Sequence, residues 1–485
     1  MNEATLTKPL AADKVSEWAG ECDVAVVGFG AAGACAAIEA AAAGARTMIF
    51  EMTSGSGGAT ALSGGEIYIG GGGGSDVQRA AGFEDATEDF QRYLEMAGGP
   101  QADKAKCAAY AEGSLDHYQW LKDQGVPYKG TYAPGKIIEP TTDDTLIWSG
   151  SELAAPFRDE AKPAPRGHVI QHEGWGGGRP LLDTFERKAR ELGTQVHVDS
   201  RVTGLIVDDG RVVGLAVKQD GEIRHYRANK GVVLTTGGFC LNPEMVAKYA
   251  PLAKDMPDAI GENDNGSGIQ MGMSVGGETI NMDQFFTTCP WIMPPGLAKG
   301  VFVNAAGARF IAEDCYHGRV SRTAIDQAGG HVYLLVDNAI FEKPIDIARV
   351  DIAAVGETWE EVERELGMAE GTLSATMAVY NKHAANGEDP VFRRGPEYMQ
   401  PLTEAPFAAL KLDFKTSYFS WFTLGGLETN VSGEVLDRSG AAIPGLYAAG
   451  RATCGLPRWG HGYSSGMSLA DCTFFGRKAG KAAAA

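Results

Sequence analysis

A short polar segment near the end of the chain places hydroxyl groups among glycines. The sequence RWGHGYSSGMSL, residues 458–469, carries Tyr463 and Ser465 just before an apolar, helix-like tail. If this loop is extended, both side chains face the same side. A neutral tyrosine hydroxyl can stabilise a developing oxyanion, at about 3 kcal/mol for one donor. A serine is too weak a base alone and needs a partner that takes up the proton. The loop therefore predicts acid–base chemistry beside a carbonyl group.

The elements that must position this loop begin with a nucleotide-binding pattern at residues 22–51. A valine-rich apolar run predicts a buried parallel strand, and GFGAAG then supplies Gly28, Gly30 and Gly33 at the spacing GxGxxG. These glycines allow a tight turn, close approach of a pyrophosphate and close helix packing, respectively. An alanine-rich helix and a second strand follow, and that strand ends at Glu51, which is placed to bind a ribose. Together these elements predict a dinucleotide at the helix N-terminus.

Glycine and serine dominate residues 54–74, after the second strand. Small residues over this length predict a loop that wraps a bulky planar ligand, and we favour cofactor contact for Gly57–Thr60. For Gly70–Gly74 a flexible linker is the alternative. Farther along, two alternating segments flank the turn DDGR and predict a hairpin. The segment GVVLTTGG then predicts a buried strand that returns to the nucleotide sheet.

Changes in composition predict an α/β protein with a Rossmann-like domain and an inserted second domain. From about residue 280 to 415, aromatic residues, prolines and charged helical segments become more frequent. The final segment repeats the pattern of a strand followed by glycine and is expected to rejoin the first domain. The predicted boundaries are a leader at 1–20, the first part of the nucleotide-binding domain at 21–279, an inserted α+β catalytic or capping domain at 280–415, and the final part of the first domain at 416–485.

Charge and cysteine content exclude several classes of function. The net charge of −19, from 43 basic and 62 acidic residues, disfavours nucleic-acid binding and anionic membrane surfaces. The eight cysteines are scattered without a CxxC pair, so we predict no metal site. Scattered cysteines suit a reducing cytosol, and we expect a cytoplasmic protein without a transmembrane helix or signal peptide.

Seven motifs, in order along nearly the whole chain, resemble those of the FAD-binding-domain-2 flavoproteins, the superfamily of fumarate reductase, succinate dehydrogenase and 3-ketosteroid dehydrogenases. They are VVGFGAAG with its terminal acid, GGATALSGG, VVLTTGGF, NGSGIQMGMSVG, VNAAGARFIAED, TLGGL and IPGLYAAG. The resemblance implies a glutathione-reductase-type FAD-binding domain and a mobile capping domain over the flavin. Covalent members attach FAD through a histidine near GGAT. The first histidine of this chain is His117, so the resemblance implies noncovalent FAD.

The motifs and the resemblance together assign cofactor contacts to the glycine loops, the strand ends and the start of the final helix. We expect that helix to begin at about Met467 and to aim its N-terminus at the reduced flavin. The expected cofactor-binding residues are Gly28, Gly30, Ala31, Ala32, Gly33, Glu51, Met52, Gly58, Ala59, Thr60, Ser63, Gly64, Gly65, Val202, Thr236, Gly237, Gly238, Asn265, Gly266, Gly450, Arg451, Gly466, Ser468 and Leu469.

Within the superfamily, the polar loop is similar to the tyrosine loop of 3-ketosteroid dehydrogenases. Trp459 and Tyr463 stand where fumarate reductases have a histidine and an arginine, which argues against a C4-dicarboxylate. A second tyrosine, Tyr316, follows the RFIAED element, and with Tyr463 and Ser465 it makes the set most similar to 3-ketosteroid Δ4-(5α)-dehydrogenase. This resemblance implies that Tyr463 binds the 3-keto oxygen. It also implies that Ser465 and Tyr316 remove a proton from C4, while a hydride from C5 passes to flavin N5.

Several alternatives remain open at this stage. Gly462 is assigned to substrate binding with Tyr463, and Tyr418 and Trp421 either line a steroid pocket or belong to a buried strand. Tyr316 can be a packing residue, and Ser465 can instead cap the final helix. His461 and Arg458 are more often structural in such a loop.

The competing functions are a 3-ketosteroid Δ1-dehydrogenase, a reductase of an enoic acid bound by Arg458, Arg319 or His461, and a flavin-binding protein without turnover. Haem and iron–sulfur ligand motifs are missing from the sequence, so we expect an external electron acceptor, either a quinone or a redox protein.

Overall fold

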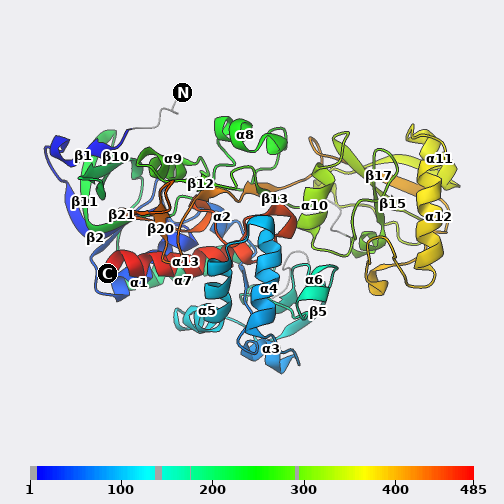
Figure 1. The fold of residues 1–485 in the computed structure, drawn as a ribbon, viewed down its shortest axis with the longest axis horizontal. Coiled ribbons are helices and arrows are strands. Elements are labelled where there is room, and N and C mark those ends of the chain that lie inside the picture. Colours follow the sequence, from blue (N-terminus) through cyan, green and yellow to red (C-terminus); the bar gives the residue numbers. More distant parts are fainter. Residues whose placement is uncertain (1–7, 137–144, 175, 290–293) are drawn as a thin grey trace.

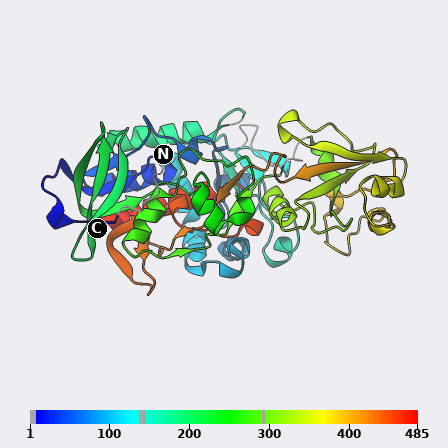
Figure 2. The same cartoon turned by 90° about the horizontal axis from the view of Figure 1, so that it is seen from above.

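The computed structural model describes residues 8–136, 145–174, 176–289 and 294–485. The molecule is elongated, with a large sheet at one end, a smaller sheet at the other end and helices below the middle (Figure 1). Seen from above, the part that carries the smaller sheet projects away from the rest (Figure 2). The α/β class predicted from the sequence is confirmed. Among the described residues, none of the helices combines the length and apolar character needed to cross a bilayer.

The large sheet has a parallel centre built from the predicted nucleotide-binding strands. β2 pairs in parallel with β3 on one side and with β11 on the other, and β21 extends the sheet beyond β11. The valines and alanines of β2 are buried because the sheet is covered on both faces. Its strands are β1 (Leu10–Ala11), β2 (Gly20–Val27), β3 (Thr47–Phe50), β8 (Gln195–His197), β9 (Arg201–Asp208), β10 (Arg211–Gln219), β11 (Glu222–Leu234), β20 (Glu434–Leu436) and β21 (Ala442–Ala448).

Two parts of this sheet differ from the simplest sequence expectation. The hairpin predicted around DDGR forms as β9 and β10, but its next strand is continuous with the predicted GVVL strand. The first half of β11 pairs with β10, and its second half pairs with β2 and β21. In addition, β1 lies inside the predicted leader and pairs with β9, so the sheet starts before residue 21.

Two helices pack closely beneath the central strands. α1 and α13 meet at glycines: a methyl group at Gly476 would lie 2.6 Å from the carbonyl oxygen of Ala32, and one at Gly480 would lie 2.0 Å from that of Ala36. Small residues therefore bring the first and last helices of this region into direct backbone contact. The helices around the large sheet are α1 (Ala31–Ala42), α2 (Gly58–Ala61), α7 (Gly178–Glu191), α8 (Pro243–Tyr249), α9 (Ser267–Ser274) and α13 (Met467–Ala484).

Residues 66–136 and 145–169 form a helical region with a small sheet, which the sequence motifs did not predict. Its strands are paired in the order β4-β7-β6-β5, and β4 is next to the start of α13 in space. The elements are β4 (Glu66–Tyr68), α3 (Asp76–Ala80), α4 (Thr87–Gly98), α5 (Lys104–Asp123), β5 (Tyr132–Lys136), β6 (Leu146–Trp148), α6 (Phe157–Glu160) and β7 (Gly167–Val169).

The smaller sheet at the far end lies within the predicted insertion. Its strand order is β14-β15-β17-β16, and its buried apolar residues form a core separate from the one around α1 and α13. We retain the boundaries 280 and 415 as a proposal, although this core also includes residues outside them, such as Phe239, Ile269 and Trp421. The elements are β14 (Val301–Asn304), α10 (His317–Ile325), β15 (His331–Val336), β16 (Asp351–Gly356), α11 (Trp359–Glu365), α12 (Thr372–Ala384) and β17 (Phe407–Asp413).

A pair of short strands connects the insertion to the rest of the chain. β13 (Phe285–Thr287) enters the insertion, β18 (Trp421–Thr423) leaves it, and the two pair with each other in antiparallel register. Next to them, β12 (Thr279–Ile280) pairs with β19 (Gly426–Leu427). Short 3-10 helices complete the structure: η1 (Ala12–Lys14), η2 (Gly99–Gln101), η3 (Pro251–Ala253), η4 (Pro295–Lys299), η5 (Asp346–Ala348), η6 (Pro396–Tyr398), η7 (Gly450–Ala452) and η8 (Gly460–Gly462).

Candidate active site

A long cavity starts at the carboxyl ends of the parallel strands and extends to Tyr316, the residue before α10. Such strand ends are the usual ligand position in open α/β sheets. Most of the predicted site residues line it together: Gly28, Gly30, Ala31, Ala32, Glu51, Met52, Gly58, Ala59, Thr60, Ser63, Gly64, Val202, Thr236, Gly237, Tyr316, Gly450, Arg451, Tyr463, Ser465, Gly466, Ser468 and Leu469.

The turn between β2 and α1 has the geometry that its glycines predict. Gly28 has φ +99°, and a methyl group there would lie 2.7 Å from the Thr235 carbonyl oxygen. A methyl group at Gly33 would lie 2.1 Å from the Gly28 carbonyl oxygen, so Gly33 packs the helix onto the strand and does not line the cavity. Gly30 instead has Thr60 Oγ1, at 3.4 Å, as the nearest atom to an added methyl group. Gly30 thus keeps space open at the N-terminus of α1, where a phosphate binds well.

Glu51 closes one end of the cavity after β3. One carboxylate oxygen accepts a hydrogen bond from the amide of Phe29 at 2.8 Å, and the other accepts from the amide and hydroxyl of Thr53 at 2.9 and 2.8 Å. A carboxylate offers about four acceptor positions. The fixed side chain therefore retains capacity for one more donor, as ribose binding requires.

The start of α2 also lines the cavity and lies beside the first turn of α1. Thr60 Oγ1 accepts a hydrogen bond from the Ala31 amide at 3.1 Å, which ties α2 to the first turn of α1. Across the cavity, Glu262 Oε2 accepts from the Gly58 amide at 3.1 Å. Thr236 Oγ1, also in the lining, is buried and lacks a hydrogen-bond partner among the described residues. A donor set of this kind, with open helix termini, fits a dinucleotide such as FAD.

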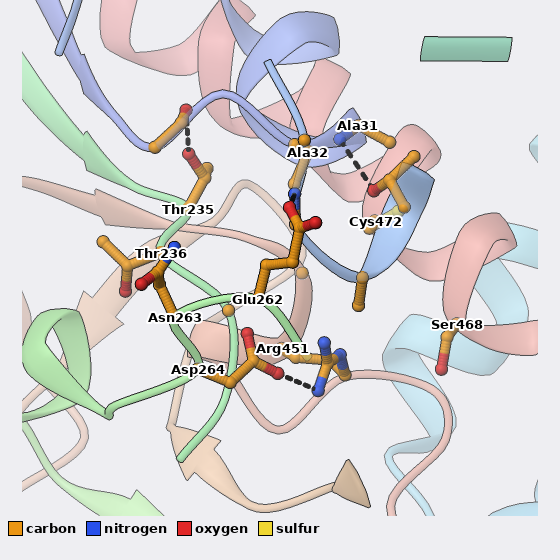
Figure 3. A pocket seen from close by; sticks show the side chains of 18 of the residues that line it. Ala31, Ala32, Thr235, Thr236, Glu262, Asn263, Asp264, Arg451, Ser468 and Cys472 are labelled. Atoms are coloured by element: carbon orange, nitrogen blue, oxygen red, sulfur yellow. Dashed lines mark hydrogen bonds and ion pairs between the residues drawn. The ribbon is translucent and has the colours of Figure 1, made fainter. Parts of the chain in front are cut away.

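A buried ion pair, Asp264–Arg451, lies in the middle of the lining (Figure 3). The distance from Asp264 Oδ2 to Arg451 Nη1 is 2.5 Å. Burial raises the pKa of Asp264, and Arg451 opposes that shift. Asp264 therefore offsets the positive charge of Arg451 in this buried setting.

Five predicted cofactor residues do not line the cavity. The four glycines among them are needed for packing, because an added methyl group would clash: at Gly65 with Gly177, at Gly238 with Thr423, at Gly266 with Met245 and at Gly33 with Gly28. The fifth, Asn265, accepts a hydrogen bond from the Ser267 amide at 3.0 Å and so orders the start of α9.

At the far end of the cavity, Tyr463 and Ser465 face the same space. The Tyr463 hydroxyl donates to Ser468 Oγ at 3.1 Å, and both Tyr463 and Ser465 belong to the lining. Ser464, between them, points the other way, with its Oγ 2.7 Å from the Tyr93 hydroxyl. The loop is not extended throughout, because it turns at Ser465 and Gly466, where the Met467 amide donates to the Ser464 carbonyl at 3.2 Å. Tyr463 and Ser465 nevertheless reach the same cavity. Burial raises the pKa of Tyr463, which keeps it a neutral donor.

Tyr316 joins them from the insertion. It is the N-cap residue of α10, is 2% exposed and also lines the cavity. Its ring centroid lies 6.2 Å from that of Tyr463, and Phe286 packs against both rings, with its centroid 4.3 Å from that of Tyr463. The predicted trio therefore shares one cavity, although Tyr316 and Tyr463 come from distant parts of the chain.

The start of α13 agrees with the expected flavin-facing helix. α13 begins at Met467, and its N-cap is Gly466, with φ +83° and no side-chain cap. Ser465 is therefore not the helix cap, the alternative role considered for it. Ser468 and Leu469, in the first turn, line the cavity and can offer their amides to a ligand.

The substrate-binding assignments of Tyr418, Trp421 and Gly462 are not supported, because these residues lie outside the cavity lining. Trp421 is buried in the core, where its indole donates to the Met256 carbonyl at 3.3 Å, and Tyr418 stacks with Arg349. A methyl group at Gly462 would lie 2.0 Å from the Ala97 carbonyl, so this glycine serves packing. Phe422, the residue after Trp421 in β18, lines this part of the cavity instead, together with Phe286 and Thr288.

The polar residues suggested for a substrate acid have structural partners. Arg458 is buried and donates to the carbonyls of Gly455, Gln101 and Cys454 at 3.0–3.1 Å. His461 Nε2 lies 2.6 Å from Asp326, and its carbonyl accepts from Arg319 at 3.0 Å. The two His461 contacts fasten η8 to α10. None of Arg458, His461 and Arg319 lines the cavity.

Sequence patterns missed a group of lining residues whose positions depend on tertiary contacts. Their only shared signal is proximity to a recognised motif, as for Thr235 beside TTGG and Glu262 before NGSG. They are Val27, Phe29, Phe50, Thr53, Leu62, Glu66, Ser200, Arg201, Thr235, Ile260, Glu262, Asn263, Asp264, Ser267, Met271, Phe286, Thr288, Phe422 and Cys472.

The chain is similar to known proteins over most of its length. A family model described as FAD binding domain matches residues 23–465. The structure resembles the crystal structure of 3-ketosteroid-Δ4-(5α)-dehydrogenase from Rhodococcus jostii RHA1 in complex with 4-androstene-3,17-dione, with 42% identity, a TM-score of 0.92, and coverage of 99% of this chain and 100% of that one.

Two curated relatives cover most of the chain. "Probable fumarate reductase Ifc3" of Shewanella frigidimarina is 30% identical over 482 residues, which cover 95% of this chain and 74% of the relative. The 3-oxo-5-alpha-steroid 4-dehydrogenase of Comamonas testosteroni is 26% identical over 504 residues, which cover 90% and 94%. The chain is therefore similar both to steroid desaturases and to reductases of unsaturated acids.

Proposed function

The chain belongs to the FAD binding domain family, and from this premise we propose that it is an FAD-dependent 3-ketosteroid dehydrogenase that introduces a C4–C5 double bond into 5α-3-ketosteroids. The observation that carries the proposal is the convergence of Tyr316, Tyr463 and Ser465 in one cavity. The 42% identity to a Δ4-(5α)-dehydrogenase over its full length supports the same assignment.

The cofactor has a definite place in this proposal. Glu51 and the N-terminus of α1 would hold its adenosine and phosphate groups, and the first turn of α13 would face the flavin. When bound, FAD supplies the acceptor for the hydride that leaves C5. The GGAT segment contains no histidine, which supports noncovalent binding.

Three side chains of the protein perform the proton chemistry in this proposal. Tyr463 turns its single hydroxyl hydrogen from Ser468 to the 3-keto oxygen and stabilises the enolate that develops there, while the Ser468 hydroxyl can donate to Tyr463 in return. Ser465 accepts the proton from C4 as it passes its own hydroxyl proton to Tyr316, which enters this step as the phenolate and leaves it as the neutral phenol. Phe286 and Phe422 supply an apolar wall of the kind that a steroid ring system requires.

The environment of the cavity gives less support to an enoic-acid reductase. A carboxylate substrate needs cations, and Arg458, Arg319 and His461 are bonded elsewhere and lie outside the lining. Arg451 lines the cavity but is paired with Asp264. An external acceptor, either a quinone or a redox protein, completes the proposed cycle.

The test is an anaerobic flavin-reduction experiment. In separate anaerobic samples, the oxidised holoprotein is mixed with 5α-androstane-3,17-dione or with 4-androstene-3,17-dione. In a third sample, the holoprotein is first reduced chemically and then mixed with fumarate. Flavin absorbance is recorded in all three samples. Bleaching by the 5α compound alone, with a 4-ene product, is expected. Bleaching by the 4-ene compound would place the reaction at C1 and C2, and reoxidation by fumarate alone would favour the reductase.

A further inference from the structure

A three-residue segment after β6 touches both candidate acid–base residues through their backbones. The carbonyl of Ser149 accepts a hydrogen bond from the Ser465 amide at 3.0 Å. Ser151 Oγ accepts a hydrogen bond from the Tyr316 amide, also at 3.0 Å. The two residues come from different regions of the chain, yet both are held by the same short segment.

Tyr93 of α4 adds a third connection. Its hydroxyl accepts from the Ser151 amide at 2.8 Å and lies 2.7 Å from Ser464 Oγ. Tyr93, Ser151 and Ser464 are all at most 3% exposed. The Tyr93 hydroxyl therefore links Ser464, the residue before Ser465, to Ser151, which holds Tyr316. Because these groups are buried, their hydrogen bonds are electrostatically stronger than they would be in water.

Gly150, the middle residue of the segment, is packed too closely to carry a side chain. A methyl group there would lie 2.4 Å from the Tyr93 hydroxyl and 2.6 Å from Ser464 Oγ. On the other side, Glu152 Oε2 accepts from the Gly150 amide at 2.8 Å, and Oε1 accepts from the Tyr68 hydroxyl at 2.8 Å. The segment is thus fixed from both sides.

We propose that Tyr93 and residues 149–151, together called the serine bridge, are positioning residues that set the separation between Ser465 and Tyr316 during proton transfer. The inference rests on the proposed function and deepens it. None of Tyr93, Ser149, Gly150 and Ser151 lines the cavity, so they act through other residues. Proton transfer requires hydrogen-bond reach between the partners, and a misplacement of about 1 Å can cost roughly 100-fold in rate.

The decisive variant is Tyr93→Phe, which keeps the ring and removes both hydroxyl contacts. The matched control is Tyr110→Phe, because Tyr110 is fully buried and its hydroxyl donates to the Tyr68 carbonyl at 2.6 Å rather than bonding to residues 149–151. In Tyr93→Phe, we expect the rate constant of flavin reduction by 5α-androstane-3,17-dione to fall roughly 10- to 100-fold. The KM should change little, because the cavity wall is intact.

A second readout separates positioning from general loosening. With substrate deuterated at C4, Tyr93→Phe should show a larger isotope effect than wild type, because proton transfer becomes more rate-limiting, whereas Tyr110→Phe should match wild type. If Tyr93→Phe does not fold, Ser151→Ala removes only the bonds of the Ser151 hydroxyl and should give the same signature.

The two hypotheses fail in different ways. Wild-type flavin that no ketosteroid bleaches would overturn the proposed function and this inference with it. An active wild type in which Tyr93→Phe and Tyr110→Phe have equal rates and equal isotope effects would overturn the inference alone.

Discussion

The hydroxyl of Tyr463 donates a hydrogen bond to Ser468 Oγ at 3.1 Å, which ties the polar loop to the first turn of α13. The same turn faces the cavity where the flavin is expected. The tyrosine is thereby held at the boundary between the proposed cofactor and substrate positions. We expect Tyr463→Phe to lower the rate of flavin reduction by ketosteroid roughly 100- to 1,000-fold, the usual effect of removing one oxyanion donor. Stopped-flow absorbance measures this rate, and an unchanged flavin spectrum is the control. A near-normal rate would remove Tyr463 from the mechanism.

Ser465→Ala tests the proton acceptor. Because the side chain faces the cavity and is not the cap of α13, its removal should leave folding intact while slowing flavin reduction at least roughly 100-fold. Thermal unfolding with bound FAD provides the check on folding. Wild-type flavin reduction in the variant would transfer the role to Tyr316.

Neighbouring residues of β18 offer a matched pair. Phe422 lines the cavity, whereas Trp421 is 2% exposed and buried in the core. We expect Phe422→Ala to raise the KM for ketosteroid with a modest effect on stability. Trp421→Ala should instead lower the free energy of unfolding by about 3–5 kcal/mol, as large-to-small core substitutions do. Urea unfolding and steady-state kinetics of both variants measure this, and reversed effects would show that the strand faces the other way.

Gly30→Ala and Gly33→Ala should separate binding from folding. An added methyl group at Gly33 would lie 2.1 Å from a backbone oxygen that cannot move aside, so this variant should fail to fold stably. At Gly30 the nearest atom is 3.4 Å away, so the fold should persist while FAD affinity falls, because the methyl group occupies the phosphate space. Apoprotein melting and FAD titration distinguish the two, and full FAD affinity in Gly30→Ala would contradict the phosphate assignment.

Stability should fall steeply on the alkaline side. Burial raises the pKa of Tyr68, Tyr93, Tyr110, Tyr128 and Tyr463 in the folded protein. A phenol in the unfolded chain titrates near pH 10. Above that pH the unfolded chain loses protons that the folded protein keeps, so the stabilisation present below pH 10 is lost as pH rises. Urea midpoints measured from about pH 8 to 11 should drop most above pH 10, and a smaller drop in Tyr110→Phe provides the check. A flat profile would contradict the burial of these phenols.

Much of the nucleotide-binding half could be predicted because its signals are local. The strand, glycine turn, helix and terminal acid of residues 22–51 follow one another in sequence, and the structure places them as β2, α1 and β3 with Glu51 at the cavity. Tyr463 and Ser465 both line the cavity, although the extended loop assumed in predicting this does not form, because the chain turns at Ser465 and Gly466.

The remaining site residues depend on contacts that no local pattern encodes. Asp264 meets Arg451, and Phe286 meets Phe422, only after distant segments come together. In SYFSWF both faces of the strand are apolar, so the sequence does not indicate that Phe422 rather than Trp421 faces the cavity. Glycines present the same difficulty, because Gly238 and Gly266 avoid clashes with protein atoms, whereas Gly30 leaves space for a ligand.

The antiparallel pair of β13 and β18 is both the connection to the insertion and part of the cavity wall. Phe286 and Phe422 are directly paired on these strands, and their ring centroids lie 4.9 Å apart. A hinge placed here would turn both rings together with the body that carries Tyr316. Opening the insertion for substrate entry would then move the aromatic wall and Tyr316 away from Tyr463 and Ser465 in one movement, and closing it would restore both together.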